Sequence, residues 1–280
     1  MKKLLMATDL SARSDRALQR ALALAHDFGA ELKIVHVVDE AFIEAITLQH
    51  EAAAKAAIAE QLRSLPLAKE IAVSTEVIRG LDFANILQAA TDFGAELVVL
   101  GIHRHATREM FQGTTAERVI RHGRQPVLVV KDAVVASYRS ALVPVDLSPH
   151  AQAAMTMAAR MVPKGEVHLV HAAHRPYTAF LGRDTQSQLI RDERARISGE
   201  LTRQVGEISA SLGDAAPRFT TVLREGEIRR VIREQVSSIK PDLLAVGTHG
   251  RTGISHAIIG SVAEDLLADA PVDVLAVKAA

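Results

Sequence analysis

The stretch GTHGRTGISHAIIGS, residues 247–261, carries four glycines and ends on a serine. It follows the aliphatic run DLLAVG at 242–247 and precedes an amphipathic stretch at 261–269, so we interpret it as a strand-to-helix loop. A glycine lets a ligand approach the main chain and permits a positive φ. The start of a helix adds unpaired N–H groups and the positive end of its dipole. The loop therefore predicts a binding site for a di- or triphosphate.

The chain contains the same pattern twice. Asp9 and Asp146 fall in matching DLS triplets, and His36 and His171 end matching aliphatic runs. Each repeat spans about 140 residues, the size of a domain. We predict one domain at 1–133 and a second at 139–280, with the seam near 131–140.

Short aliphatic runs alternate with longer amphipathic stretches in both repeats. In the second repeat the runs predicted to be strands lie at 140–146, 166–172, 218–223, 242–247 and 271–277. They are apolar on both faces, as buried parallel strands are. Alternation of strand and helix predicts an α/β fold in which helices cover both faces of a parallel sheet. Ligands bind such sheets at the carboxyl ends of the strands, where the strand order reverses.

Composition limits the classes of protein that this chain can represent. Lys plus Arg and Asp plus Glu both number 33, which argues against a general nucleic-acid binder. The absence of Cys excludes a disulfide framework and a thiol nucleophile. No apolar run approaches the roughly 18 residues of a membrane span, and the apolar N-terminal stretch breaks at Asp9, too early for a signal peptide. We expect a cytoplasmic protein that binds neither nucleic acid nor membrane.

Residues after other strands suit the rest of a nucleotide. The Asp146 carboxylate accepts hydrogen bonds only, which suits the two hydroxyls of a ribose. Pro144 stiffens this edge, and the backbone at Ala172 suits an adenine edge. An alternative without a ligand is open, because Ser261 and Glu264 match a capping box. The histidines at 36 and 171 are expected to form structural hydrogen bonds.

The spacing Gly247-x2-Gly250-x9-Gly260-Ser261, followed by VDVLAV, resembles the nucleotide-binding motif of the universal stress protein family. The resemblance covers nearly the whole chain as two tandem copies. It implies two doubly wound domains of the adenine-nucleotide alpha-hydrolase-like class, each with five parallel strands. It also implies pairing through the last strands, which makes a pseudo-dimer within the chain and leaves a further homodimer open. Carried over by position, the nucleotide-binding residues are Pro144, Val145, Asp146, Ala172, Gly247, His249, Gly250, Arg251, Gly260, Ser261 and Val262.

The first repeat departs from this motif. Arg104 stands where the second glycine belongs, and eight residues instead of nine separate it from Gly113. Its side chain either fills the pocket or donates to a phosphate. Thr114 replaces the serine and forms a capping box with Glu117. The resulting degenerate site comprises Asp9, Val37, Gly101, Arg104, Gly113 and Thr114, and we expect it to bind ATP weakly or not at all.

Catalysis and metal binding have weaker support. Phosphoryl transfer needs a metal clamp and a group that positions the nucleophile, and the loop offers no obvious carboxylate for Mg²⁺. We assign no catalytic residue, while slow ATP hydrolysis or self-phosphorylation stays open, as does Mg²⁺ bound with the ATP. The histidines 103, 105 and 122 suit Zn²⁺, but lack the spacing of a zinc site, so no metal site is assigned.

The leading hypothesis is an ATP-binding stress or signalling protein in which the second repeat holds the nucleotide. The first alternative is a nucleotide-free scaffold of the same fold that acts through association, since the last strands at 125–130 and 271–277 are hydrophobic edges. The second is an ATP-consuming enzyme such as an adenylating enzyme. That alternative lacks a recognisable catalytic group.

Overall fold

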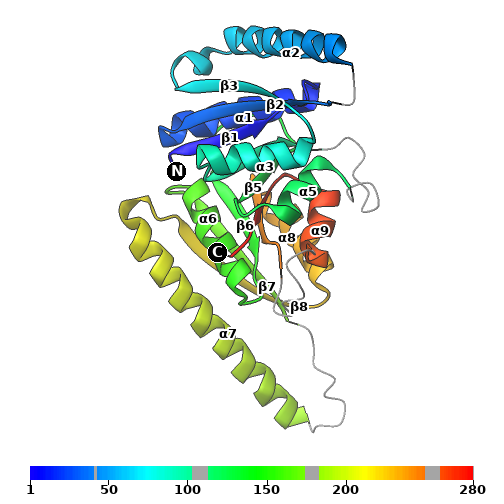
Figure 1. Cartoon of the computed structure of the whole chain (residues 1–280). Helices are drawn as coiled ribbons and strands as arrows, with labels where there is room; N and C mark the ends of the chain where they lie inside the picture. Colours follow the sequence, from blue (N-terminus) through cyan, green and yellow to red (C-terminus); the bar gives the residue numbers. More distant parts are fainter. Residues whose placement is uncertain (41–42, 103–112, 174–182, 250–258, 280) are drawn as a thin grey trace. The chain divides into compact units, whose positions relative to one another are not determined.

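The computed structural model describes residues 1–40, 43–102, 113–173, 183–249 and 259–279. By their contacts these residues form two compact units (Figure 1). Unit 1 draws on 1–137 and 259–276, and unit 2 draws on 138–249 and 277–279. None of the described helices is long and apolar enough to cross a membrane.

Unit 1 contains the first repeat as alternating strands and helices. Its elements are β1 (Lys3–Ala7), α1 (Ala12–Phe28), β2 (Glu31–Val38), α2 (Glu44–Ser64), the 3-10 turn η1 (Pro66–Lys69), β3 (Val73–Arg79), α3 (Asp82–Phe93), β4 (Leu97–Gly101), α5 (Thr115–His122) and β5 (Val127–Val130). The end of the second repeat adds α9 (Ser261–Ala268) and β10 (Asp273–Val277). All four residues of β5, and four of the five in β1 and β4, are buried, which confirms strands that are apolar on both faces.

The order of the five parallel strands is β3-β2-β1-β4-β5. The chain steps one way along the sheet from β1 to β2 and the other way from β3 to β4. Because such crossovers are right-handed, α1 and α3 cover opposite faces (Figure 1). The strand order therefore reverses between β1 and β4, and a crevice is expected at their carboxyl ends.

The last strands of the two repeats pair with each other. β10 runs antiparallel to β5, with Val274 opposite Val129 and Leu275 opposite Leu128. The pairing through the last strand that the resemblance implied is thus confirmed. β10 is thus an antiparallel strand beside the five parallel ones. The pairing satisfies a row of backbone groups that each of these short apolar strands would otherwise leave unpaired at an edge.

A buried ion pair stabilises this junction. Asp273 is 2% exposed, and its Oδ1 accepts hydrogen bonds from the amides of Lys131 and Asp132 at 2.8 and 3.1 Å. Its Oδ2 lies 3.4 Å from Arg20 Nε, and Arg20 Nη1 donates to the carbonyl of Ala136 at 2.8 Å. One carboxylate in β10 therefore holds α1 and the segment that follows β5.

Unit 2 repeats the arrangement with four described strands. Its elements are β6 (Ser140–Pro144), α6 (Pro149–Met161), β7 (Glu166–Ala173), α7 (Arg183–Leu212), the 3-10 turn η2 (Gly213–Ala215), β8 (Arg218–Glu225), α8 (Ile228–Ile239) and β9 (Leu243–Gly247). The strand order is β9-β6-β7-β8, and all neighbours are parallel. Helix α6 begins with Pro149 in its first turn, and the Ser148 hydroxyl accepts from the Ala151 amide at 3.2 Å.

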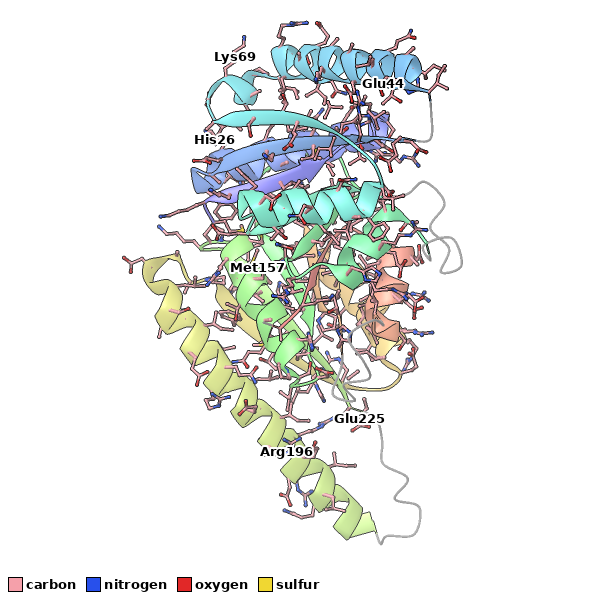
Figure 2. The ribbon with its side chains drawn as sticks, viewed as in Figure 1. His26, Glu44, Lys69, Met157, Arg196 and Glu225 are labelled. Carbon is pink, nitrogen blue, oxygen red and sulfur yellow. The ribbon has the colours of Figure 1, made fainter. Side chains whose placement is uncertain are left out.

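Helix α7 is amphipathic in its C-terminal part. Ile197, Leu201 and Ile208 are buried, whereas Arg196 and Glu193 form an ion pair on the solvent side. Figure 2 shows Arg196 among the charged side chains along this helix. The polar face of this part of the helix is thus exposed to solvent.

Replacing Asp273 with Ala is expected to lower the free energy of unfolding by about 3–5 kcal/mol, because it leaves the Arg20 guanidinium buried without its partner. Denaturant unfolding followed by circular dichroism measures the change. The matched control is Glu60→Ala, which removes an exposed ion pair with Arg63 and is expected to change little. An Asp273 variant as stable as this control would contradict the structural role.

Candidate functional site

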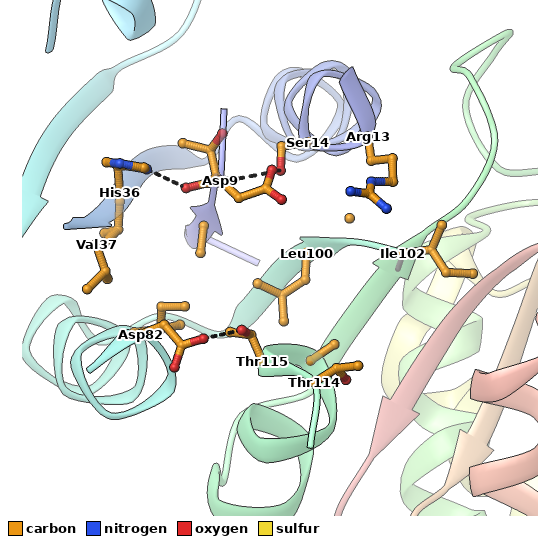
Figure 3. Close-up of a pocket in the computed structure, with 16 residues that line it drawn as sticks. Asp9, Arg13, Ser14, His36, Val37, Asp82, Leu100, Ile102, Thr114 and Thr115 are labelled. Carbon is orange, nitrogen blue, oxygen red and sulfur yellow. Dashed lines mark hydrogen bonds between the residues drawn. The ribbon is translucent and has the colours of Figure 1, made fainter. Parts of the chain in front are cut away.

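The first repeat forms a cavity of about 230 Å³ at the carboxyl ends of its strands (Figure 3). The strands β1, β2 and β4 and the first turns of α1, α3 and α5 surround it. The lining residues are Ala7, Thr8, Asp9, Arg13, Ser14, Val35, His36, Val37, Asp82, Ile86, Leu100, Gly101, Ile102, Thr114, Thr115 and Ala116. This is the crevice that the reversal of strand order predicts.

Four residues predicted for the degenerate site meet in this cavity: Asp9, Val37, Gly101 and Thr114. Gly113 directly precedes Thr114 at the start of α5 and has a φ of 86°. This left-handed conformation favours glycine. Arg104 lies outside the described residues.

Asp9 is held rigidly at the edge of the cavity. Its Oδ1 accepts from the Ser11 amide at 2.9 Å and from the Ser14 hydroxyl at 2.5 Å. Burial raises the pKa of this carboxyl, but hydrogen bonds from Ser11 and Ser14 and the nearby Arg13 guanidinium outweigh burial, so the pKa lies below its ordinary value. Asp9 is therefore an ionised acceptor at neutral pH.

Both repeats place this aspartate with the same unusual turn. Leu10 and Leu147, which follow the two aspartates, have φ angles of 61° and 66°. A left-handed backbone is uncommon for a residue with a Cβ and carries a cost of order 1–3 kcal/mol. In each copy the turn lets the aspartate accept from the amide two residues later, at 2.9 Å for Asp9 and 3.0 Å for Asp146.

The paired histidines form the structural hydrogen bonds expected of them. His36 Nδ1 lies 2.8 Å from the carbonyl oxygen of Thr8, and His171 Nδ1 lies 2.7 Å from that of Val145. A carbonyl oxygen only accepts, so Nδ1 carries the proton in both rings. Each histidine thereby joins the second strand of its repeat to the residue that precedes the site aspartate.

The predicted capping box of the first repeat is confirmed. Thr114 Oγ1 accepts from the Glu117 amide at 3.1 Å, while Glu117 Oε2 accepts from the Gly113 amide at 3.0 Å. In the second repeat the prediction is wrong. The cap of α9 is Gly260, with no side-chain hydrogen bond, and exposed Ser261 is the first helical residue. Helix α9 begins one residue earlier relative to the motif, so the serine hydroxyl is not at the capping position.

Several cavity residues were not indicated by the sequence patterns. Arg13 and Ser14 begin α1, Asp82 begins α3, and the Thr115 hydroxyl donates to Asp82 Oδ2. No pattern along the chain brings them together, because they lie on three separate helices.

In unit 2 the predicted residues follow adjacent strands. Pro144 ends β6, with Val145 and Asp146 directly after it, and Ala172 lies in β7. Gly247 ends the neighbouring strand β9. Of the loop residues, His249 is described, whereas Gly250 and Arg251 lie outside the described residues. Gly260, Ser261 and Val262 belong to the start of α9, which is part of unit 1.

His150 is a further residue near Asp146 that the motif did not indicate. Its Nδ1 accepts from the Ala279 amide at 2.9 Å, and its ring centroid lies 4.9 Å from that of His249 in the loop after β9. Burial lowers the pKa of His150, the nearby Asp146 opposes this shift and Lys278 adds to it. A neutral imidazole therefore lies beside the site aspartate at neutral pH.

Gly247 has a structural role that the glycine motif does not predict. A Cβ at this position would lie 2.7 Å from the carbonyl carbon of His150 and 2.9 Å from the amide of Ala151. Gly101 approaches Arg13 and Ser14 of α1 in the same way, at 3.1–3.3 Å. In both copies this glycine makes room for the first turn of a helix.

Of the histidine group of the first repeat, the described part of the chain contains His122 alone. His103 and His105 lie outside it, and the His122 ring centroid is 5.8 Å from that of Phe83. The described residues contain no group of three or more side chains suited to hold a metal ion.

Comparison with known proteins agrees with the tandem organisation. The model of the universal stress protein family matches residues 1–131 and again residues 137–278. The chain belongs to the universal stress protein family. Its two copies of the family domain make it a tandem universal stress protein.

Individual universal stress proteins resemble one half of the chain or all of it. A universal stress protein of Methanocaldococcus jannaschii is 30% identical over 139 residues, which are 46% of this chain and 82% of the relative. The crystal structure of a universal stress protein from Archaeoglobus fulgidus has a TM-score of 0.70 at 18% identity and covers 99% of this chain and 96% of its own. A functionally unknown protein from Pseudomonas aeruginosa PAO1 has a TM-score of 0.64 at 20% identity, covering 100% and 93%. These structures share the two-domain α/β fold.

Replacing Ser14 with Ala is expected to raise the pKa of Asp9, because it removes a donor to the ionised carboxylate. A carboxyl whose pKa is lowered by folding stabilises the folded state above its ordinary pKa, and this contribution is lost as the pH falls through the folded value. The variant is therefore less stable than the parent at neutral pH, and the difference shrinks in acid. Titration of the Asp9 carboxyl carbon by NMR measures the shift. Ser64→Ala, at an exposed site, is the control, and an unchanged Asp9 pKa in Ser14→Ala would refute the assignment.

Replacing Gly247 with Ala is expected to lower the free energy of unfolding by about 1–3 kcal/mol, because the added methyl group overlaps the backbone of α6. Gly199→Ala in α7 is the matched control. No atom lies within 4 Å of its added Cβ, and Ala favours helix over Gly by up to about 1 kcal/mol. Equal stability changes in denaturant unfolding of the two variants would show that the close approach at Gly247 has no energetic consequence.

Proposed function

We propose that this tandem universal stress protein binds ATP through its second repeat and acts in a stress response or in signalling. The proposal rests on the start of α9. Gly260 caps this helix without a side-chain hydrogen bond, and Ser261 is exposed in the first turn. The first N–H groups of a helix have no partner within it, and a glycine at the cap brings no side chain to them. They suit a phosphate, which the positive end of the helix dipole also favours.

The aspartate of the second repeat is suited to bind the ribose of the same nucleotide. Asp146 Oδ1 is fixed by the Ser148 amide at 3.0 Å. A carboxylate held in one orientation accepts from a vicinal diol without first losing conformational freedom. The backbone at Ala172, on the neighbouring strand, supplies hydrogen-bonding groups for the adenine edge.

The remaining assignments follow from the motif. Gly250 leaves space for the phosphates, and Arg251 attracts their charge. Gly247 acts indirectly, since its missing side chain lets α6 approach the strand end. We propose a role in binding, with Mg²⁺ as a companion of the ATP and with hydrolysis or self-phosphorylation slow at most. A cytoplasmic location, a pseudo-dimer within the chain and a further homodimer are parts of the same proposal.

Titration calorimetry with ATP tests the function. The parent chain is expected to bind about one ATP, and Gly250→Arg, which copies the residue of the first repeat, is expected to bind none because the side chain fills the phosphate space. Gly199→Ala serves as the control and is expected to bind like the parent. If neither the parent nor the control binds, the nucleotide-free scaffold becomes the better account. If ATP turnover by the parent exceeds that of Gly250→Arg, the site also catalyses hydrolysis.

A further inference from the structure

The cavity of the first repeat differs chemically from the matching region of the second repeat. At four positions, polar or charged residues of the first copy replace other types. The residue of the first repeat and its counterpart in the second are Arg13 with His150, Ser14 with Ala151, Asp82 with Ile228, and Thr115 with Val262. All four first-repeat residues line the cavity. At Ser14, Asp82 and Thr115 the cavity of the first repeat thus carries polar side chains where the second repeat has apolar ones.

One of these groups places a negative charge across the cavity from Asp9. Asp82 accepts a hydrogen bond from the Thr115 hydroxyl through Oδ2, and both side chains line the cavity. Figure 3 shows this pair on one side of the cavity and Asp9 with Ser14 on the other. An anionic ligand group near the start of α5 would meet the Asp82 carboxylate.

Side chains of α5 already occupy part of the helix start that a phosphate would use. The capping box occupies the amides of Gly113 and Glu117. It also holds the Glu117 carboxylate, 4% exposed, at the positive end of the helix dipole, where Glu117 Oε1 forms an ion pair with Arg121. Helix α9 of the second repeat has no such side-chain cap. The two helix starts are thus capped differently.

The rest of the cavity suits a ligand with an apolar ring and hydroxyl groups. Asp9 presents an ionised acceptor whose charge Arg13 offsets. Val35, Ile86 and Leu100 supply an apolar wall. The volume of about 230 Å³ lies below the range of about 300–1,000 Å³ that is usual for drug-sized ligands, so the ligand is small.

We infer that the first-repeat cavity binds a phosphate-free, nucleoside-like ligand and rejects nucleotides. Asp9 accepts from the ligand hydroxyls, the apolar wall contacts the ring, and Asp82 repels a phosphate. The chain then carries two sites of different selectivity. This inference stands apart from the proposed ATP site, because it concerns the other repeat and a different ligand.

Calorimetry on the full chain with Asp146→Ala, which removes the ribose acceptor of the second repeat, tests the inference with adenosine and AMP as probes. These ligands differ only in the phosphate. Adenosine is expected to bind about once per chain, and AMP at least tenfold more weakly. Adding Asp9→Ala is expected to abolish adenosine binding.

Selectivity is tested by adding Asp82→Asn to the same background, which keeps the shape of the side chain and removes its charge. The affinity for AMP relative to that for adenosine is expected to rise about tenfold compared with the chain that carries Asp146→Ala alone. Asp92→Asn, an exposed change on the same helix α3, is the matched control and is expected to leave the ratio unchanged. Thermal unfolding confirms that each variant is folded.

Two results would overturn the inference. One is AMP binding as tightly as adenosine in the Asp146→Ala chain, and the other is no adenosine binding in that chain. Neither outcome depends on the ATP site, whose failure appears separately as loss of ATP binding by the parent chain.

Discussion

The right-handed crossover is the constraint on which the rest of the structure depends. Together with the reversal of strand order beside the first strand, it places helices on both faces of each parallel sheet. In unit 1 the reversal lies between the paired strands β1 and β4. The cavity that contains Asp9 and Gly101 lies at the carboxyl ends of these strands. The glycine at the end of the fourth strand allows the first helix to approach, and the left-handed leucine turns the aspartate toward the edge. Both repeats keep these two devices.

The two copies share a framework and differ in what their helix starts leave available. In the first copy, Thr114 and Glu117 satisfy the backbone of α5 internally. In the second, Gly260 caps α9 without using a side chain. A helix whose own side chains accept from its first N–H groups is stable without a ligand, whereas a helix without such a cap can use these groups to bind one. Loss of the motif in one repeat therefore changes the chemistry of the cleft and preserves the fold.

Much of the fold was predictable because local and periodic signals agree. The sequence indicates the repeat, the buried strands and the cap at Ser148, and the structure contains all three. The site was predictable in part. Asp9, Val37, Gly101 and Thr114 meet in one cavity, but Asp82 and Thr115 come from distant segments, and no pattern along the chain joins them. The motif also attributed Gly247 to ligand access, whereas the contact that excludes a Cβ there comes from His150 and Ala151.

The sequence by itself determined the tandem α/β organisation and the family, because hydrophobic periodicity and motif spacing are properties of neighbouring letters. Tertiary structure alone decided which side chains share the first-repeat cavity and that Asp273 of β10 anchors Arg20 of α1. It also decided that Ser261 begins a helix instead of capping it. Each of these outcomes depends on the distance between backbones far apart in the chain or on the exact residue at which a helix begins. Packing sets both, and local propensity does not.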